Sequence, residues 1–192
     1  MKNSEKGWWE NFRWFYSSEK VLVVGGKNAE SNDDLLKNHL DSKEIVLHTE
    51  DPGSPFFIIK GYAGKKTIKE AGIACASYSQ GWKKGLTSMK VEYFVSEQLK
   101  KEKRMKDGTW GVSGKVKSMT VKLELAIGVD EEGNIIGGPV DAIEKKADKF
   151  VIIHPGGDDK EVVTREVTKR VDGNEAEVVR FVPAGKSHIH KA

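Results

Sequence analysis

Short apolar runs separated by polar, turn-forming stretches dominate the first two thirds of the chain. Continuous apolar runs are typical of central strands, and alternating apolar and polar residues are typical of strands with one buried face. These patterns predict five strands in one sheet, over residues 21–24, 45–49, 56–60, 89–95 and 116–127. Within 109–129, Ser113 and Gly114 are expected to turn a hairpin with a long second arm.

A polar helix is expected between the first two strands, over residues 28–40. Its leucines share one face, and Asn28 or Ser31 can cap its first turn. The second and third strands are joined by the sequence Asp-Pro-Gly-Ser at 51–54. Proline fixes one φ and glycine permits a positive one, so this link is predicted to be a tight turn.

A second helix is expected over residues 68–82, where Thr67 and Glu70 have the spacing of a capping box. One of its faces carries only alanine, glycine, serine and Cys75, and small side chains permit close approach to a sheet. Cys75 is expected to fill space there. The predicted fold is α+β: a mostly antiparallel sheet packed around this small-residue central helix, with an added C-terminal α/β segment.

Six aromatic residues stand between positions 8 and 16. Aromatic clusters can be stacking platforms for nucleic-acid bases, but they are more often core. The spacing of Trp8, Phe12 and Phe15 suits one helical face, so we expect a helix that docks on the core.

The chain after residue 130 is expected to form a small subdomain, so we divide the chain into 1–129 and 130–192. Helices are predicted over 139–147 and 158–171, strands over 150–153 and 176–182, and a turn over 154–157.

The net charge of the 192 residues is +3, but the basic residues are unevenly distributed. Residues 83–122 hold 11 basic and 4 acidic side chains, and local basic density governs phosphate binding more than total charge does. A single cysteine excludes an internal disulfide. With no apolar run of membrane-spanning length and no signal peptide, we expect a cytoplasmic protein without a membrane partner.

Four sequence blocks carry a family resemblance. They are WWENFRWFYSSEK at 8–20, VVGGKNAESND at 23–33, HTEDPGSP at 48–55 and KTIKEAGIACASYS at 66–79. In this order they resemble the NFACT-R domain, the RNA-binding module of the ribosome-associated quality-control proteins (RqcH, NEMF and FbpA-like proteins). The chain looks like a stand-alone NFACT-R protein. Pro55 stands where bacterial members often have histidine.

The resemblance implies an RNA-binding protein that contacts tRNA or ribosomal RNA in ribosome-associated quality control, with the large ribosomal subunit as a further partner. Groups able to bind RNA gather at strand ends, turns and the basic run. The candidate RNA-contacting residues are Lys27, Asn28, Asn32, His48, Thr49, Asp51, Gly53, Ser54, Lys100, Lys101, Lys103 and Arg104.

The same residues allow other functions. His48 beside Glu50 and Asp51 could perform acid–base chemistry, so an RNA-modifying enzyme acting on tRNA is one alternative. A protein–protein adaptor using the tryptophan-rich start is another. No nucleotide-hydrolysis motif or zinc spacing is present, and we expect neither cofactor nor metal and assign no catalytic residue. The Gly25-Gly26-Lys27 link could cradle a phosphate before the first helix.

Overall fold

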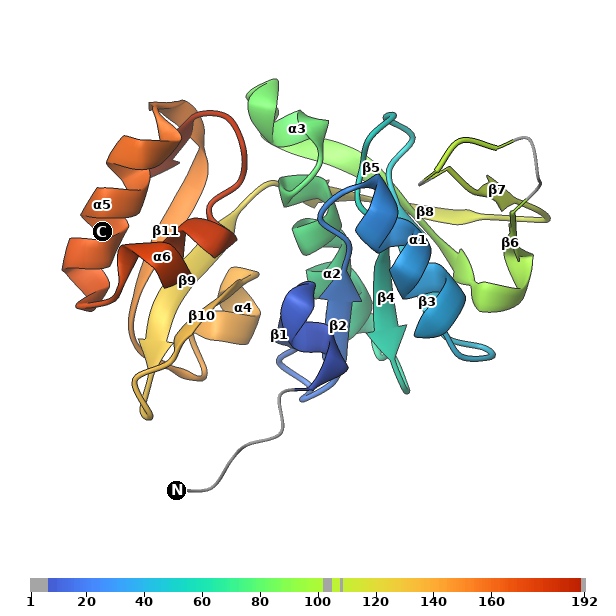
Figure 1. The fold of residues 1–192 in the computed structure, drawn as a ribbon, viewed down its shortest axis with the longest axis horizontal. Helices are drawn as coiled ribbons and strands as arrows, with labels where there is room; N and C mark the ends of the chain where they lie inside the picture. Colours follow the sequence, from blue (N-terminus) through green and yellow to red (C-terminus); the bar gives the residue numbers. More distant parts are fainter. Residues whose placement is uncertain (1–6, 102–104, 108, 191–192) are drawn as a thin grey trace.

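The fold is described from a computed structural model, for residues 7–101, 105–107 and 109–190. Two antiparallel sheets lie on either side of a central helix, α2 (Lys65–Ser77) (Figure 1). The α+β prediction and the central small-residue helix are therefore confirmed. Among the described residues, none of the helices has the length and apolar character needed to span a bilayer.

The larger sheet has six strands in the order β1-β2-β4-β3-β5-β8, and every neighbouring pair is antiparallel. Its strands are β1 (Arg13–Tyr16), β2 (Leu22–Gly25), β3 (Ile45–His48), β4 (Phe57–Lys60), β5 (Ser88–Val95) and β8 (Lys117–Lys122). A two-stranded extension follows β5, made by β6 (Leu99–Lys100) and β7 (Gly111–Val112).

The smaller sheet has four strands in the order β10-β9-β11-β12, also antiparallel. Its strands are β9 (Leu125–Asp130), β10 (Ile135–Gly138), β11 (Ala147–Asp158) and β12 (Ser187–Ile189). We call residues 125–190 the C-terminal segment. The division of the chain at residue 130 stays a prediction.

Helices cover both sheets (Figure 1). The α-helices besides α2 are α1 (Ala29–Asn38), α3 (Gln80–Lys83), α4 (Val140–Ile143), α5 (Lys160–Val171) and α6 (Glu175–Val178). Short 3₁₀ turns are η1 (Trp8–Asn11), η2 (Ser96–Gln98) and η3 (Val179–Phe181).

Alternate residues of the central strands pack on opposite faces, as the period of a strand requires. Val23, Leu47 and Phe57 join α2 and the C-terminal segment in one continuous core. Val24 and Val46, their chain neighbours, join a second cluster under α1. The sheet is thus buried on both sides, which explains its continuous apolar runs.

The turn between β1 and β2 is tied to the first turns of α2 by two carboxylates. Glu19 Oε1 accepts hydrogen bonds from the backbone nitrogen and hydroxyl of Thr67, at 2.8 and 2.7 Å. The buried Glu70 accepts from the backbone nitrogen and hydroxyl of Ser18, also at 2.8 and 2.7 Å. The predicted capping box is therefore wrong: the helix begins at Lys65, and Thr67 and Glu70 bind another segment.

The expected helix over the aromatic start is also wrong, because this segment is η1 followed by the edge strand β1. Phe12 packs under α1, whereas Phe15 packs on the opposite face with α2. A single helical face could not reach both. The expectation that these rings belong to the core is confirmed for Phe12 and Phe15, which are buried, and in part for Trp8, Trp9 and Trp14, which pack against it, whereas Tyr16 is exposed.

Four further expectations differ from the structure. The 109–129 hairpin is wrong because β7 pairs with β6, β8 pairs with β5, and β9 crosses into the other sheet. Residues 154–157 lie within β11 and pair across a bulge with β12. Residues 176–182 are α6 and η3, because Asn174 caps a helix there. Only residues 140–143 of the 139–147 helix are helical.

The close approach of α2 to the sheet gives a first prediction. Ala71 is fully buried on its inner face, so Ala71→Leu should overpack the core and lower the free energy of unfolding by about 1–3 kcal/mol. Lys69→Leu, on the exposed face of the same helix, is the matched control and should change it by less than about 0.5 kcal/mol. Urea titrations followed by circular dichroism measure both. Equal stability of the two variants would contradict the packing of α2.

Candidate functional site

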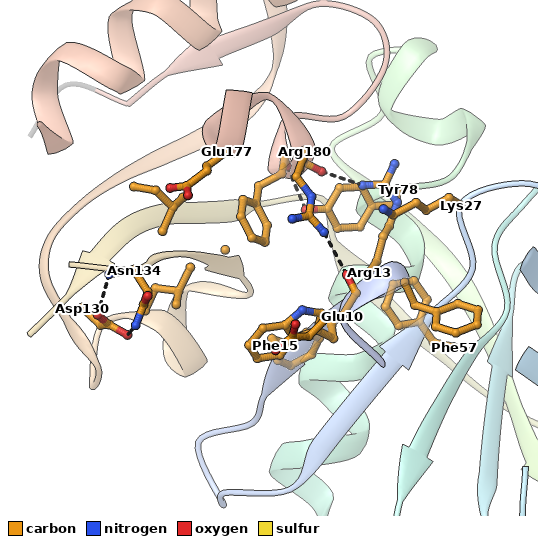
Figure 2. Close-up of a pocket in the computed structure, with 16 residues that line it drawn as sticks. Glu10, Arg13, Phe15, Lys27, Phe57, Tyr78, Asp130, Asn134, Glu177 and Arg180 are labelled. Atoms are coloured by element: carbon orange, nitrogen blue, oxygen red, sulfur yellow. Dashed lines mark hydrogen bonds between the residues drawn. The ribbon is translucent and has the colours of Figure 1, made fainter. Parts of the chain in front are cut away.

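A cavity of about 450 Å³ lies where the two sheets meet. Its walls come from η1 and β1 on one side and from β10, α6 and η3 on the other (Figure 2). Figure 2 shows the side chains of Arg13, Lys27 and Arg180 near one end, with Asp130 and Glu177 towards the other. We call this space the junction cavity.

Arg13 is held in place by contacts from both sides of the junction cavity. Its Nη1 donates a hydrogen bond to the Arg180 carbonyl at 3.1 Å, and its guanidinium lies 4.0 Å from the centre of the Tyr78 ring. The Tyr78 hydroxyl donates to the Phe181 carbonyl at 2.8 Å. Burial lowers the pKa of Arg13 and raises that of Tyr78 to about 12.

Arg180 completes the clamp by donating from Nη2 to the Glu10 carbonyl at 2.9 Å. Lys27, just before α1, reaches the same cavity. Partial burial, followed by repulsion from Arg180 and Arg13, lowers the pKa of Lys27. Burial and repulsion from Arg13 act in the same direction on Lys160 nearby. Several cations therefore converge at this junction.

These cations lack acidic partners in the described part of the chain. No ion pair there joins Arg13, Lys27 or Arg180 to a carboxylate. Grouped cations that form no ion pair repel one another and favour an anionic ligand. The arrangement can hold a phosphate with charge-assisted hydrogen bonds.

The 48–54 turn, by contrast, uses most of its polar groups internally. The hydroxyls of Thr49 and Ser54 bond to each other, and the Ser54 nitrogen donates to the Asp51 carbonyl at 3.4 Å. The Asp51 carboxylate lies 3.5 Å from Lys84 rather than bonding its own backbone. Gly53 has φ +80°, so the expected need for glycine is confirmed.

Asn28 and Asn32 also have structural partners. Asn28 Oδ1 caps α1 by accepting from the Ser31 nitrogen at 2.8 Å, which confirms it as the cap. The buried Asn32 accepts from the Phe56 nitrogen at 3.1 Å and donates to the Ser54 carbonyl at 3.4 Å. Asn32 thus fastens the 48–54 turn to α1.

The glycine pair before Lys27 is explained by packing. A Cβ on Gly25 would overlap the Phe57 ring, and one on Gly26 would overlap the Asn32 side chain. The backbone nitrogens of Lys27 and Asn28 donate to Ser31 Oγ at 2.7 and 3.0 Å. The phosphate-binding potential of this segment therefore lies in the Lys27 side chain, not in its backbone.

The basic run is divided by its contacts. Lys100 is exposed on β6, whereas Lys101 Nζ donates to the carbonyls of Lys106 and Thr109 at 2.8 and 2.7 Å. Lys101 also lies 3.4 Å from Asp33, which accepts from Trp110 Nε1 at 2.8 Å. Lys101 therefore holds the β6–β7 extension against α1. The other two candidates, Lys103 and Arg104, lie outside the described residues.

His48 has an environment that suits a neutral ring. It stacks on Phe56 with ring centres 4.0 Å apart, and burial lowers its pKa to about 4. Glu50 pairs with Lys90 at 2.9 Å. Among the described residues, no hydrogen bond or ion pair joins His48 to Glu50 or Asp51. This region and Lys27 line different cavities.

The sequence pattern does not point to Arg13, Arg180 or Tyr78. Arg13 is the one cation within the aromatic run, and a strand pattern there would have placed it beside the sheet. Arg180 carried no local signal, because its place depends on contacts with residues 167 or more positions away. Within the described residues, no cluster of side chains suits a metal ion.

A family model described as the NFACT protein RNA binding domain matches residues 11–114. The chain belongs to the NFACT-R family. The matched residues run from just before β1 to just after β7 and include Arg13, Lys27 and the 48–54 turn.

Relatives of this NFACT-R chain extend the comparison. The archaeal Rqc2 homolog aRqcH of Methanocaldococcus jannaschii is 27% identical over 97% of this chain and 30% of its own length. The ribosome quality control complex subunit NEMF of Homo sapiens is 34% identical over 39% of this chain and 7% of its own, and the NEMF homolog of Drosophila melanogaster is 40% identical over 39% and 8%. The chain thus spans under a third of these relatives.

A solved structure shares the fold. The C-terminal part of the fibronectin/fibrinogen-binding protein from Streptococcus suis has a TM-score of 0.53 at 18% identity, over 58% of this chain and 45% of its own. The archaeal alignment reaches beyond residue 114, so similarity to a relative extends into the C-terminal segment of this NFACT-R protein.

The low pKa of His48 gives a second prediction. The pKa of His48 is about 4 in the folded protein, against an ordinary value of 6.5. As the pH falls, the unfolded chain therefore takes up the proton before the folded protein does. The contribution of a neutral His48 to stability is therefore complete above about pH 6.5 and is lost towards pH 4, by about 1–3 kcal/mol. Urea unfolding of wild type and His48→Gln at pH 7.5 and 4.5 measures it.

Carboxylates contribute equally to both proteins, so the difference between them isolates His48. Wild type should lose more stability than His48→Gln between these two pH values. An equal loss in both proteins would show that His48 is not held neutral.

Proposed function

We propose that this NFACT-R chain binds RNA in ribosome quality control, and that its RNA is tRNA or ribosomal RNA. The observation that carries the proposal is the cluster of Arg13, Lys27 and Arg180 in the junction cavity, which has no carboxylate partner among the described residues. The matched family is described as an RNA binding domain, so we propose RNA as the anionic ligand.

The names of the relatives support the setting. The human and fly proteins are named as subunits of the ribosome quality control complex. On this basis we propose the large ribosomal subunit as a partner and the cytoplasm as the compartment. The relatives are much longer than this chain, so the proposal concerns RNA attachment and not the activity of a whole quality-control protein.

We assign different roles to the candidate residues. Lys27 and Lys100 present side-chain ammonium groups without an ion pair to a described carboxylate, so we propose them as phosphate contacts. Asn28, Asn32, Thr49, Asp51, Gly53, Ser54 and Lys101 are proposed to act indirectly, by positioning α1 and the β6–β7 extension. His48 is proposed to support the turn as a neutral ring.

Phosphate contacts predict a salt-dependent affinity. Fluorescence anisotropy with labelled tRNA and with a ribosomal RNA fragment should give a linear fall of log affinity with log salt. Lys100→Ala should weaken binding to both RNAs alike, by about threefold to tenfold, and reduce the slope by about 0.7–0.9. Lys169→Ala, on the exposed side of α5, is the matched control and should leave both quantities unchanged.

Affinity for neither RNA, at low salt and with a folded protein, would refute the proposed function. Equal effects of Lys100→Ala and Lys169→Ala would remove Lys100 from the interface while leaving RNA binding in place.

A further inference from the structure

The junction cavity continues into an apolar slot of about 240 Å³. The slot and the cavity share the walls formed by Trp14, Phe15, Ile136 and Phe181. The cavity therefore has a cationic end and an aromatic end. A combined space of this kind is within the usual range for small-molecule sites, which are mostly apolar with a few placed polar groups.

Two glycines of β10 set the aromatic end. A Cβ on Gly137 would overlap the Phe181 ring, and a Cβ on Gly138 would lie 3.1 Å from the Phe15 ring. Both rings can therefore lie directly against the strand. Phe15 is buried in the core, so the partly exposed Phe181 is the ring of this pair that can stack on an unpaired base. Such stacking is the usual means of binding single-stranded RNA.

The charges of the cavity favour one orientation of a ligand. The side chains of Arg13, Lys27 and Arg180 are near one end, which also holds Glu10, whereas Asp130 and Glu177 lie towards the other (Figure 2). Lys146 lines the slot. The first end has three cations to one carboxylate, so it attracts a phosphate more strongly than the end with Asp130 and Glu177 does. A nucleotide with its phosphate among the cations would point its base towards the slot.

The site is made jointly by the two parts of the chain. Arg13, Phe15 and Lys27 belong to the stretch matched by the family model, whereas Arg180 and Phe181 belong to the C-terminal segment. The clamp between Arg13 and the Arg180 carbonyl, at 3.1 Å, joins the two halves. Neither part holds the whole set of groups.

We propose that the junction cavity binds one nucleotide of single-stranded RNA, with its phosphate at Arg13, Lys27 and Arg180 and its base in the apolar slot. The C-terminal segment is then part of the RNA site, because it supplies Arg180 and Phe181. The proposal rests on the proposed RNA-binding function, and it adds the form of the RNA and the residues that receive it.

The first experiment compares a labelled single-stranded RNA octamer with a hairpin duplex, using the full chain. Wild type should bind the octamer about tenfold more tightly. Lys27→Ala and Arg180→Gln should each weaken octamer binding about fivefold to tenfold, because each removes a charge-assisted phosphate contact. Phe181→Leu keeps an apolar side chain but loses the ring face, and should weaken it about fivefold.

Matched controls remove equal charge elsewhere. Lys37→Ala lies on α1 and Arg165→Gln on α5, and both side chains are exposed. Each should change octamer affinity less than twofold. Thermal unfolding of every variant establishes that it is folded, and Lys27, being exposed, keeps the test valid if Arg180→Gln is unstable.

A second experiment identifies the chemical group that is bound. A nucleoside 5′-monophosphate should compete with the octamer at concentrations where inorganic phosphate does not. Octamers with and without terminal phosphates then tell a chain-end phosphate from a backbone phosphate. Tighter binding of a phosphorylated end assigns the site to that end, equal binding assigns it to the backbone, and both keep the nucleotide in the cavity.

Three results would overturn the inference. Equal effects of Lys27→Ala and Lys37→Ala would reduce the contact to general electrostatics. Equal competition by inorganic phosphate and nucleoside monophosphate would remove the base from the slot. Wild type that binds duplex as well as octamer, with the cavity variants unaffected, would place RNA elsewhere and leave the proposed function standing, whereas no RNA binding at all would end both proposals.

Discussion

Glu19 and Glu70 join the turn between β1 and β2 to α2 through hydrogen bonds, and the position of the edge strand β1 depends on these contacts. Each carboxylate accepts two hydrogen bonds, so the backbone and hydroxyl donors of Ser18 and Thr67 are satisfied. Hydrogen bonds to charged groups are among the stronger polar contacts in proteins. Because β1 carries Arg13 and Phe15, the same contacts orient the wall of the junction cavity.

The junction cavity keeps like charges together at a cost in stability. Arg13, Lys27 and the nearby Lys160 all have lowered pKa values, because burial disfavours their charged forms, and repulsion from neighbouring arginines adds to this at Lys27 and Lys160. A protein selected only for stability would pair these cations with carboxylates. An anionic ligand that binds transiently at the cavity can relieve the repulsion between these unpaired cations. Such an arrangement is typical of binding sites.

The sequence predicted those features that depend on local pattern. The central strands, α1 with its Asn28 cap, the small-residue helix and the Gly53 turn all follow from periodicity and backbone preference over a few residues. The spacing of Thr67 and Glu70 wrongly predicted a capping box, because both side chains form hydrogen bonds with the turn between β1 and β2 instead. The junction cavity could not be predicted from local pattern, since Arg13 and Arg180 come together only through contacts between segments that are distant in the sequence. Local pattern found the scaffold, and long-range contacts made the site.

The core that both sheets share has a consequence for how the chain folds during synthesis. The face of α2 contacts residues of β9 as well as the six-stranded sheet, and Leu125, Ile127 and Ile153 are fully buried there. Until β9 and β11 have left the exit tunnel, the nascent chain exposes this apolar face. The delay between the emergence of α2 and its burial is a period of aggregation risk in which a chaperone at the tunnel exit would find a ready substrate.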